Sequence, residues 1–490
     1  MKLSELLSDL QPDEVRGGGD PEIASLTFDS RTVAPGSCFF AVEGEKSDGH
    51  DFAAAAVKAG AAAVICRRMP ENPDPAAVWV RVDDTREALG LISSAFYGHP
   101  SRSLQLVGIT GTNGKTTTAT LLYDLFRAAG IESGLISTVV YRIAGRSIES
   151  THTTPDPIRL NAMLRQMVDS GCRCCFMEVS SHAVVQRRIA GLKFAGGIFT
   201  NITHDHLDYH KTFAEYIRAK KRFFDELPAE AFALVNADDR NGLVMVQNTR
   251  ARISTMSLRS AADFRCKVVE MHFDGMMLRF GSDEVWVDFI GRFNAANLLA
   301  VSSAAQLLGL ERGEVLRLLS TLHSVSGRFE HMRSADAVTA VVDYAHTPDA
   351  LLNVLRTIDE IRRPGQSLIT VCGCGGDRDR TKRPEMARIA AEYSSTAVFT
   401  SDNPRSEEPG EILAEMIAGL KPGTPYMKIT DRAEAIRAAV MTARPGDIVL
   451  VAGKGHETYQ IIGTEKRHFD DREHIAAAFA DRAKAANRDL

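Results

Sequence analysis

A glycine-rich segment ending in lysine and threonine carries the strongest chemical signal in the sequence. It follows the apolar run 104–109 and precedes a helical pattern at 116–129. Glycines let backbone N–H groups approach phosphate oxygens, and the start of a helix adds a favourable dipole. Lys115 would reach the β- and γ-phosphates of a nucleotide, and Thr116 would place its hydroxyl on Mg²⁺. The residues expected around the phosphates are Gly111, Thr112, Asn113, Gly114, Lys115, Thr116 and Thr117.

Two further residues with metal-binding side chains follow apolar strand candidates. Glu178 lies at the end of the candidate strand 174–179, and His206 follows the candidate strand 197–200. Together with Thr116 they could hold Mg²⁺, for which oxygen ligands are suited and imidazole is less usual. A solvated acid at a strand end and a solvated loop histidine are the alternative interpretations.

The elements that must position these residues predict an α/β protein of about three domains, at roughly 100–200 residues per domain. We divide the 490 residues into 1–100, 101–332 and 333–490. Strands alternate with helices throughout, which is typical of mainly parallel sheets with covered faces. Residues 264–290 alternate apolar and polar side chains between turns, so we expect an antiparallel edge on the central sheet.

The loops that carry chemistry follow strands in both the second and the third domain. Sites in parallel α/β sheets gather at the carboxyl ends of the strands. We therefore expect the active site to lie in the cleft between these two domains.

Composition excludes several classes of partner. The net charge of −5 gives no reason to expect nucleic acid or a charged membrane surface. The sequence contains no run of about 18 apolar residues, the length needed to span a membrane. The first twelve residues lack the basic flank of an export signal. We expect a cytoplasmic monomer that binds small molecules and whose eight cysteines are reduced thiols.

The motifs taken together resemble the Mur ligase family. Its members carry the shortened loop found here at 111–116, in which Ile109 stands where a strict P-loop has glycine. The further motifs follow in family order and span essentially the whole chain: Glu178-Val-Ser-Ser-His182, Asn201-Ile-Thr-His-Asp-His206, Lys220, Asn236-Ala-Asp-Asp239, Gly291-Arg-Phe-Asn294-Ala-Ala-Asn297, Gly327-Arg328-Phe-Glu330 and Asp343-Tyr-Ala-His346-Thr-Pro348. The resemblance implies an N-terminal UDP-binding domain, a central ATPase domain built on a P-loop mononucleotide-binding sheet, and a C-terminal Rossmann-like domain.

The resemblance also implies a reaction. ATP would phosphorylate a substrate carboxylate, and an amine would then displace phosphate from the acyl phosphate. Such phosphoryl transfer depends on alignment and charge neutralisation more than on covalent help from the protein. Lys115, Glu178, His206 and Lys220 are the implied catalytic residues.

Lys220 owes its predicted role to the resemblance alone. It lies in the expected helix 213–225, where periodicity makes it a surface lysine and Lys221 an equal candidate. The resemblance implies that CO₂ carbamylates Lys220 to N6-carboxylysine, which requires a neutral amine and hence a lowered pKa. It also implies two Mg²⁺ positions, with ligands from Thr116, Glu178, His206 and modified Lys220.

Other polar residues match positions that bind adenine, ribose or phosphate in relatives. They are Asn294, Asn297, Arg328, Asp343 and His346. Arg328 precedes the junction with the third domain and could couple nucleotide binding to domain closure. For the two asparagines, satisfying buried backbone groups is the alternative role.

The resemblance places a UDP-muramoyl dipeptide across the first two domains. The implied contacts are Phe28, Ser30, Glu45, Lys46, Ser47, His152, Thr153, Thr154, Ser180, Gln186 and Arg188. Arg188 is chemically suited to an anionic peptide. Asp29 could contribute or could simply cap a turn.

The segment Asp402-Asn403-Pro404-Arg405 is typical of the branch of the family that adds meso-diaminopimelate to UDP-N-acetylmuramoyl-L-alanyl-D-glutamate. A guanidinium can bind the distal carboxylate of diaminopimelate with two hydrogen bonds, which a lysine substrate could not satisfy. Arg405 and Arg383 are the candidate cations, and Glu457, near Gly453, could bind the distal ammonium.

Three alternatives compete with this interpretation. A folylpolyglutamate synthetase would not require about 100 residues before the nucleotide loop. A lysine-adding sister enzyme is disfavoured by Arg405. A P-loop regulatory ATPase or switch would explain 111–117 but not the cationic loops near the C-terminus.

Overall fold

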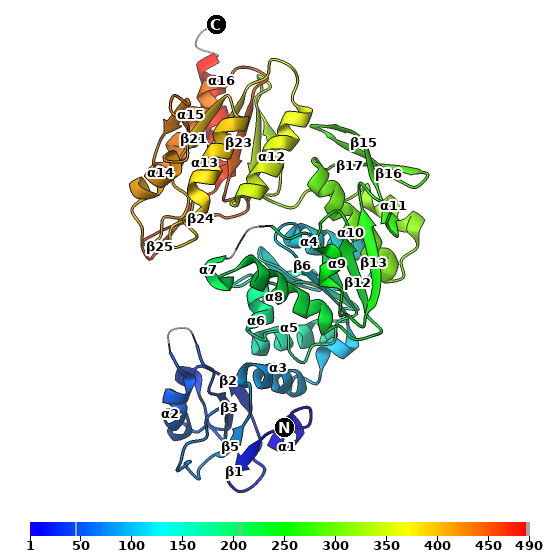
Figure 1. Cartoon of the computed structure of the whole chain (residues 1–490), viewed down its shortest axis with the longest axis vertical. Coiled ribbons are helices and arrows are strands. Elements are labelled where there is room, and N and C mark those ends of the chain that lie inside the picture. The colour runs from blue at the N-terminus through cyan, green and yellow to red at the C-terminus, as the bar shows by residue number, and fades with distance from the viewer. Residues whose placement is uncertain (45–46, 204, 206, 487–490) are drawn as a thin grey trace.

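Three α/β units follow one another along the long axis of the molecule (Figure 1). The computed structural model describes residues 1–44, 47–203, 205 and 207–486. Glu45, Lys46 and His206, which we expected to bind substrate or metal, lie outside the described residues. Within the described ranges no helix is long and apolar enough to cross a membrane.

The N-terminal unit contains a five-stranded sheet in the order β1-β5-β4-β3-β2. The apolar residues of β4 are completely buried, and Ala88 and Ile92 of helix α3 pack against the same core. The elements are α1 (Leu3–Leu6), β1 (Glu14–Arg16), β2 (Ser25–Thr27), η1 (Ser30–Thr32), β3 (Ser37–Phe40), η2 (Gly49–Phe52), α2 (Ala53–Lys58), β4 (Ala63–Cys66), β5 (Val78–Arg81), α3 (Thr85–Phe96) and η3 (Pro100–Ser103).

The middle unit is built on a nine-stranded sheet in the order β14-β13-β12-β11-β6-β10-β7-β8-β9. Its strands are β6 (Gln105–Thr110), β7 (Ser133–Ile136), β8 (Val140–Ile143), β9 (Arg146–Glu149), β10 (Cys174–Glu178), β11 (Gly196–Phe199), β12 (Phe232–Asn236), β13 (Arg252–Ser257) and β14 (Phe264–Arg265). The helices are α4 (Lys115–Ala128), α5 (Pro157–Asp169), α6 (Ser181–Val185), α7 (Leu207–His210), α8 (Phe213–Asp225), α9 (Gly242–Met245), α10 (Arg292–Leu307) and α11 (Arg312–Leu319).

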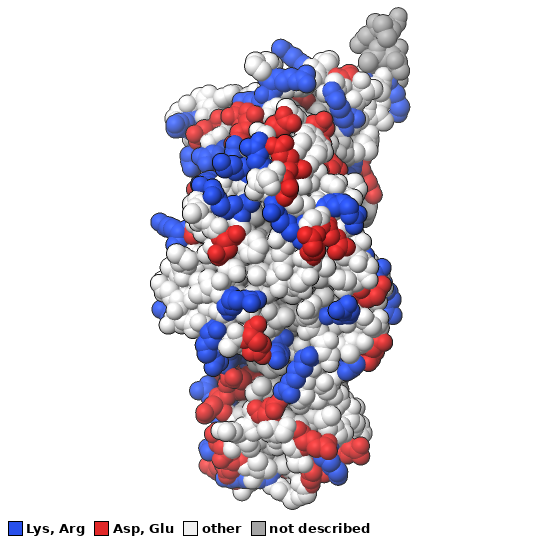
Figure 2. Space-filling model, turned by 90° about the vertical axis from the view of Figure 1, so that its right-hand side faces the viewer, with Lys and Arg blue, Asp and Glu red and all other residues white. Residues whose placement is uncertain are grey.

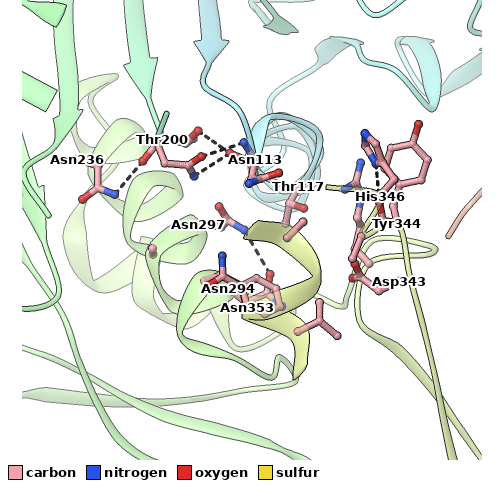
Figure 3. A pocket seen from close by; sticks show the side chains of 18 of the residues that line it. Asn113, Thr117, Thr200, Asn236, Asn294, Asn297, Asp343, Tyr344, His346 and Asn353 are labelled. Atoms are coloured by element: carbon pink, nitrogen blue, oxygen red, sulfur yellow. Dashed lines mark hydrogen bonds between the residues drawn. The ribbon is translucent and has the colours of Figure 1, made fainter. Parts of the chain in front are cut away.

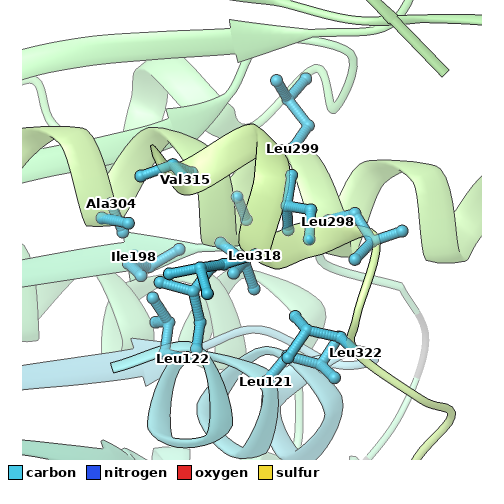
Figure 4. Packing of buried hydrophobic residues seen from close by; sticks show 14 of the residues in the cluster. Leu121, Leu122, Ile198, Leu298, Leu299, Ala304, Val315, Leu318 and Leu322 are labelled. Atoms are coloured by element: carbon cyan, nitrogen blue, oxygen red, sulfur yellow. The ribbon is translucent and has the colours of Figure 1, made fainter. Parts of the chain in front are cut away.

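Helices α4, α10 and α11 pack together against this sheet (Figure 4). Leu121 and Leu122 of α4 meet Leu298 of α10 and Leu318 of α11 in one apolar cluster, which also contains Ile198 of β11. Burying each large apolar side chain stabilises the fold by about 1.5–3 kcal/mol. Because α4 begins at Lys115, this cluster is the main support of the nucleotide loop.

The expected antiparallel edge of the central sheet is present, but residues 264–290 do not form it. The edge consists of β8 and β9, which pair antiparallel beside β7. Residues 267–287 form a separate three-stranded antiparallel sheet of β15 (Lys267–His272), β16 (Gly275–Phe280) and β17 (Asp283–Val287). Alternating polarity predicts antiparallel pairing but does not specify the partner sheet, so this expectation was wrong in its location.

The C-terminal unit has a six-stranded sheet in the order β18-β19-β23-β20-β21-β22, parallel except for β18. Its elements are β18 (Glu330–Arg333), β19 (Thr339–Asp343), α12 (Pro348–Ile361), β20 (Leu368–Cys372), α13 (Lys382–Tyr393), β21 (Thr396–Phe399), α14 (Pro409–Ile417), β22 (Tyr426–Lys428), α15 (Arg432–Thr442), β23 (Ile448–Ala452), β24 (Tyr459–Ile462), β25 (Glu465–His468) and α16 (Asp471–Ala486). Because β18 begins at Glu330, this sheet starts slightly before the expected boundary at 333.

Basic and acidic side chains are mixed over the face shown in Figure 2, in keeping with the small net charge. Both signs occur at the N-terminal and the C-terminal end of the molecule. This face therefore offers no extended surface of a single charge.

Candidate active site between the second and third units

The nucleotide loop adopts a backbone that glycine permits. Gly114, the residue before α4, has a φ of 86°, and a Cβ there would collide with the side-chain oxygen of Asn297. The two residues that follow β11 hold the loop: Thr112 N donates to Asn201 O at 2.8 Å, and Thr200 Oγ1 donates to Asn113 O at 2.6 Å. The sequence thus forms the strand, loop and helix that a phosphate site requires.

Lys115 and Lys220 converge on this loop from different helices. Lys115 Nζ donates to the carbonyls of Gly111 and Thr112 at 3.0 and 2.9 Å. Lys220 Nζ, from α8, also donates to Gly111 O, at 2.8 Å. Residue 220 is only 1% exposed, whereas Lys221 pairs with Asp225. The structure therefore distinguishes the two lysines that periodicity could not separate.

The environment of Lys220 favours its neutral form. Burial lowers the pKa of Lys220 well below its ordinary value of 10.5, and the charge of Lys115 lowers it further. Asp205 opposes this shift. A neutral amine is the species that reacts with CO₂, so the site meets this requirement for carbamylation.

Glu178 ends β10 as a buried carboxylate beside the nucleotide loop. Its two oxygens accept hydrogen bonds from the backbone N–H and the hydroxyl of Thr138, at 2.7 and 3.2 Å. Thr116 lies at the start of α4, where its Oγ1 accepts a bond from Arg328 at 3.4 Å. Hydroxyl and carboxylate oxygens are the donors that Mg²⁺ prefers, so the described residues fit this ion by type.

A pocket opens beside the loop and is lined by both the second and the third unit (Figure 3). Asn294 and Asn297 reach it from α10, while Asp343, Tyr344 and His346 reach it from the end of β19. Asn294 Nδ2 donates to Ile290 O at 2.8 Å, so its side-chain NH₂ group also satisfies a backbone carbonyl. Polar groups from two domains thus surround a concave apolar-lined site of the kind that binds nucleosides.

Burial strongly perturbs the titratable groups of this pocket. It raises the pKa of Asp343 to about 6, although the Arg328 charge acts in the opposite direction. It lowers the pKa of His346 to about 4, and the charge of Lys382 lowers it further. At neutral pH His346 is therefore an uncharged imidazole, whose Nδ1 lies 2.8 Å from Tyr344 O.

Asp349 also contacts the nucleotide loop, although we did not select it from the sequence. It lies in the first turn of α12, and its Oδ2 accepts hydrogen bonds from Asn113 at 3.1 Å and Asn353 at 3.2 Å. The C-terminal unit is therefore bonded directly to the loop. The sequence did carry a signal for Asp349. This acid follows Thr347 and Pro348 at the start of the helix that comes after β19, and functional residues gather at such strand ends.

Five residues expected at the dipeptide site lie together near the end of β10. Thr154 Oγ1 donates to Glu178 O at 2.8 Å and lies 3.5 Å from Ser180 Oγ. Arg188 donates to Thr154 O at 2.7 Å and to Gln186 Oε1. Thr153 joins them through Thr138. His152 is exposed at the rim.

The described residues expected to bind the uridine end lie in the N-terminal unit. Phe28 is 44% exposed, Ser30 begins η1, and Ser47 is exposed. Asp29 caps η1 and also holds Arg31, so it has the turn-capping role considered above. Arg187 links this unit to the middle one, because its guanidinium pairs with Glu87 of α3 and with Glu226.

The segment Asp402–Arg405 lies against the loop that carries Gly453 and Glu457. Asn403 Nδ2 donates to Glu457 Oε2 at 2.9 Å, and a Cβ on Gly453 would contact Asp402. Arg405 has a φ of 53° and donates to Gly376 O at 2.7 Å. Pro404 is buried beside it. Glycine at 453 is therefore needed for the two loops to approach each other.

Arg383 and Arg378 occupy very different positions near this site. The Arg383 side chain is completely buried, and its guanidinium bonds to Glu407 and Glu415 and to Gly375 O. Arg378 is exposed, and its charge is near enough to lower the pKa of Arg405, after the larger effect of burial. The geometry suits Arg383 to holding the loop and Arg378 to facing a ligand. Both belong to one Arg-rich segment, and sequence periodicity could not tell them apart.

The junction between the second and third units packs against the loop that carries Gly453 and Glu457. Gly327 has a φ of 68°, and a Cβ there would collide with the backbone of Gly455 and His456. The next residue, Arg328, contacts Thr116 and lies over the Tyr344 ring at 4.6 Å. One short segment thus touches both Thr116 at the start of α4 and the loop that carries Gly453 and Glu457.

The fold and this site define a three-domain, P-loop-containing ligase architecture. Residues 109–305 match the Mur ligase middle domain, 327–455 match the Mur ligase, glutamate ligase domain, and 22–97 match the Mur ligase family, catalytic domain. The chain belongs to the Mur ligase family, which confirms the resemblance and the three-domain α/β fold.

Close relatives cover nearly the whole chain. Proteins named UDP-N-acetylmuramoyl-L-alanyl-D-glutamate--2,6-diaminopimelate ligase are 54% identical in Bacteroides thetaiotaomicron, covering 98% of this chain and 100% of the relative, and 54% identical in Cytophaga hutchinsonii, covering 96% and 98%. A solved structure with the same name has a TM-score of 0.71 at 31% identity, covering 99% of both chains. A folylpolyglutamate synthase from Mycobacterium tuberculosis, at 17% identity and a TM-score of 0.61, shares the fold; it covers 76% of this chain and 92% of its own.

Proposed function

We propose that this chain is the ATP-dependent ligase that adds meso-2,6-diaminopimelate to UDP-N-acetylmuramoyl-L-alanyl-D-glutamate, giving ADP and phosphate. Relatives of this name align along the full length at more than half identity. The observation that carries the substrate assignment is the proximity of Asn403, Arg405 and Glu457 in the third unit, where Asn403 bonds to Glu457 and the charge of Glu457 acts on Arg405. In the cell we expect a cytoplasmic enzyme of peptidoglycan precursor synthesis that acts as a monomer.

The reaction begins at the cleft between the second and third units. The dipeptide carboxylate attacks the γ-phosphorus of ATP, the bond to the β-phosphate oxygen breaks, and ADP leaves. The neutral amine of diaminopimelate then attacks the acyl phosphate, loses a proton and releases phosphate. Lys115 and Arg328 supply positive charge at the triphosphate, while the pocket of Asn294, Asn297, Asp343 and His346 fixes the nucleoside.

Lys220 takes part as its carbamate. Its neutral amine adds to CO₂, forms an N–C bond and releases one proton, which converts a buried neutral amine into an anion. Thr116, Glu178, carbamylated Lys220 and His206, which lies outside the described residues, would hold Mg²⁺. The ion would neutralise phosphate charge.

The amine is selected in the third unit by opposite charges. Arg405, with Arg378 beside it, provides guanidinium groups for the distal carboxylate, and Glu457 provides a carboxylate for the distal ammonium. Arg383 supports this site indirectly, because its guanidinium donates hydrogen bonds to both carboxylate oxygens of Glu407. Its charge, through hydrogen bonds, lowers the pKa of Glu407 to about 2.

Phosphate release with UDP-N-acetylmuramoyl-L-alanyl-D-glutamate tests the proposal directly. Parallel reactions contain meso-diaminopimelate, L-lysine or no amine, and mass spectrometry identifies the product. We expect rapid turnover with diaminopimelate alone. Equal turnover with lysine would contradict the substrate assignment, and phosphate release without amine would indicate an ATPase.

A further inference from the structure

Lys454 is a completely buried lysine in the loop that carries Gly453 and Glu457. It follows Gly453 at the end of β23, and residue 454 has no exposed surface. Its Nζ lies 3.1 Å from Asn403 Oδ1 and 3.3 Å from Glu457 Oε2. It also lies 5.7 Å from the centre of the Tyr459 ring. A buried ammonium with a carboxylate and an amide as partners is costly to assemble, which argues for a specific role.

The hydrogen bonds around Lys454 fix the orientation of Asn403. Its Oδ1 accepts from Lys454 and from the backbone N–H of Ile461, at 3.0 Å. The amide nitrogen must therefore point the other way, and it donates to Glu457 Oε2 at 2.9 Å. Reversal of this amide would place its NH₂ group against two donors.

Both bonds to the Glu457 side chain end on one oxygen. Lys454 and Asn403 donate to Oε2, whereas Oε1 accepts no hydrogen bond from any residue in the described part of the chain. Oε1 therefore keeps its lone pairs for an incoming donor. The side chain is 14% exposed, so such a donor could reach it.

The surroundings of Glu457 raise its pKa, and the charge of Lys454 limits that rise. Burial and the charge of Asp402 raise the pKa of Glu457, whereas Lys454 and the Asn403 bond lower it. The other facing groups are Arg405, Tyr344 and Tyr459. Loss of Lys454 would leave Glu457 and Asp402 facing each other, and Glu457 would be protonated at higher pH.

We propose that Lys454 is a positioning residue that keeps Glu457 ionised and directs Glu457 Oε1 toward the distal ammonium of the amine substrate. This inference rests on the proposed function, since it needs a substrate with a second ammonium group. Lys454 itself makes no contact with substrate. It acts through Glu457 and Asn403.

The test measures KM for meso-diaminopimelate in wild type and Lys454→Met at pH 6.5 and 8.5. Deprotonation of the attacking amine affects both enzymes equally and cancels in the ratio of their KM values. We expect the Lys454→Met to wild-type ratio to fall by about tenfold as the pH rises, the factor for one pKa unit. A ratio that is high but equal at both pH values indicates a structural role only and overturns the inference.

A substrate analogue separates failure of this inference from failure of the proposed function. 2-Aminopimelate has both carboxylates and the reacting amine but lacks the distal ammonium. We expect wild type to prefer diaminopimelate, and Lys454→Met to lose that preference at pH 6.5. If wild type uses both equally, the role of Glu457 in the proposed function fails. If wild type discriminates and Lys454→Met keeps the same preference, only the role of Lys454 fails.

Two further variants control for folding and for loss of a lysine. Lys466→Met removes an exposed lysine that lies 4.0 Å from the same Tyr459 ring, and it should leave the KM ratio near one. Lys454→Met/Glu457→Gln replaces the buried pair by neutral groups and tests the role even if the single variant is unstable. Relative to Glu457→Gln, the double variant should change KM by less than about twofold. A much larger further loss would show that Lys454 does not act through Glu457.

Discussion

The two lysines that are buried among the described residues, Lys220 and Lys454, have opposite surroundings. Lys220 donates to a backbone carbonyl and has another cation, Lys115, nearby. Lys454 is bonded to a carboxylate and an amide oxygen. The surroundings of Lys220 favour the neutral amine, which is the reactive form, while the hydrogen bonds of Lys454 orient its neighbours.

This difference separates the chemistry of the two halves of the cleft. The middle unit places Lys115 and Lys220 against the nucleotide loop, where the proposed function needs cations and a reactive amine. The C-terminal unit places the Lys454–Glu457 pair close to the guanidinium of Arg405, which suits recognition of a substrate that carries both signs. The following predictions test that division.

Replacement of Lys220 should produce the largest effect. Lys220→Ala removes the carbamate and should lower kcat by at least about 10²–10³-fold, as loss of a preorganised charge at a reacting centre does. Steady-state phosphate release measures the effect. Lys221→Ala, at the adjacent, partly buried position where the lysine pairs with Asp225, is the matched control and should stay within about twofold. Equal losses in both variants would remove the distinction between these lysines.

Loss of Arg405 should affect only the amino-acid half of the cleft. Arg405→Ala should lower kcat/KM for diaminopimelate by about 10–150-fold, the equivalent of one charged hydrogen-bonded contact. ATP affinity, measured by calorimetric titration, should remain unchanged. A parallel loss of ATP affinity would contradict the separation of the two sites.

Stability should respond differently to the same substitution at the two buried lysines. Lys454→Met leaves Glu457 without its charged partner and should destabilise the C-terminal unit by about 3 kcal/mol, or about 6–12 °C in Tm. Lys220→Met removes one hydrogen bond to Gly111 O, which still accepts from Lys115, and should stay within about 1 kcal/mol of wild type. Differential scanning calorimetry provides the comparison. Similar shifts for both variants would show that pairing does not matter.

The pH dependence of stability should provide the smallest but most specific signal. The unfolded chain binds a proton at Lys220 that the folded chain lacks, between the lowered pKa and the ordinary value of 10.5. Stability should therefore rise with pH across that window, and the rise should be smaller in Lys220→Met. Urea unfolding in CO₂-free, metal-free buffer measures the two slopes. Identical slopes would mean that Lys220 stays charged in the fold.

The elements that depend on local pattern were predictable. The helix 213–225 occurs with the expected bounds, and the candidate strand 174–179 forms as Cys174–Glu178, because amphipathic periodicity and a buried apolar run specify them. The nucleotide loop was equally accessible, since its glycines and lysine act within one short segment.

Features that depend on contacts between distant segments were not accessible in this way. Arg383 and Arg378 lie five residues apart in one polar segment, and only the fold shows that Glu407 and Glu415 enclose the first of them. Asp349 contacts Asn113, and Lys454 contacts Asn403. These partners are far away in sequence, so the roles of Asp349 and Lys454 could not be predicted from local pattern. The partner sheet of residues 264–290 was misjudged for the same reason.

The close packing at Gly327 limits how this chain can vary. Even one methyl group at this position would push Gly455 and His456 away and, through Arg328, disturb the hydroxyl of Thr116. Both substrate sites would be damaged by an atom that contacts neither substrate. In a saturation mutagenesis screen, position 327 should therefore accept glycine only, although it lies outside every binding pocket described above.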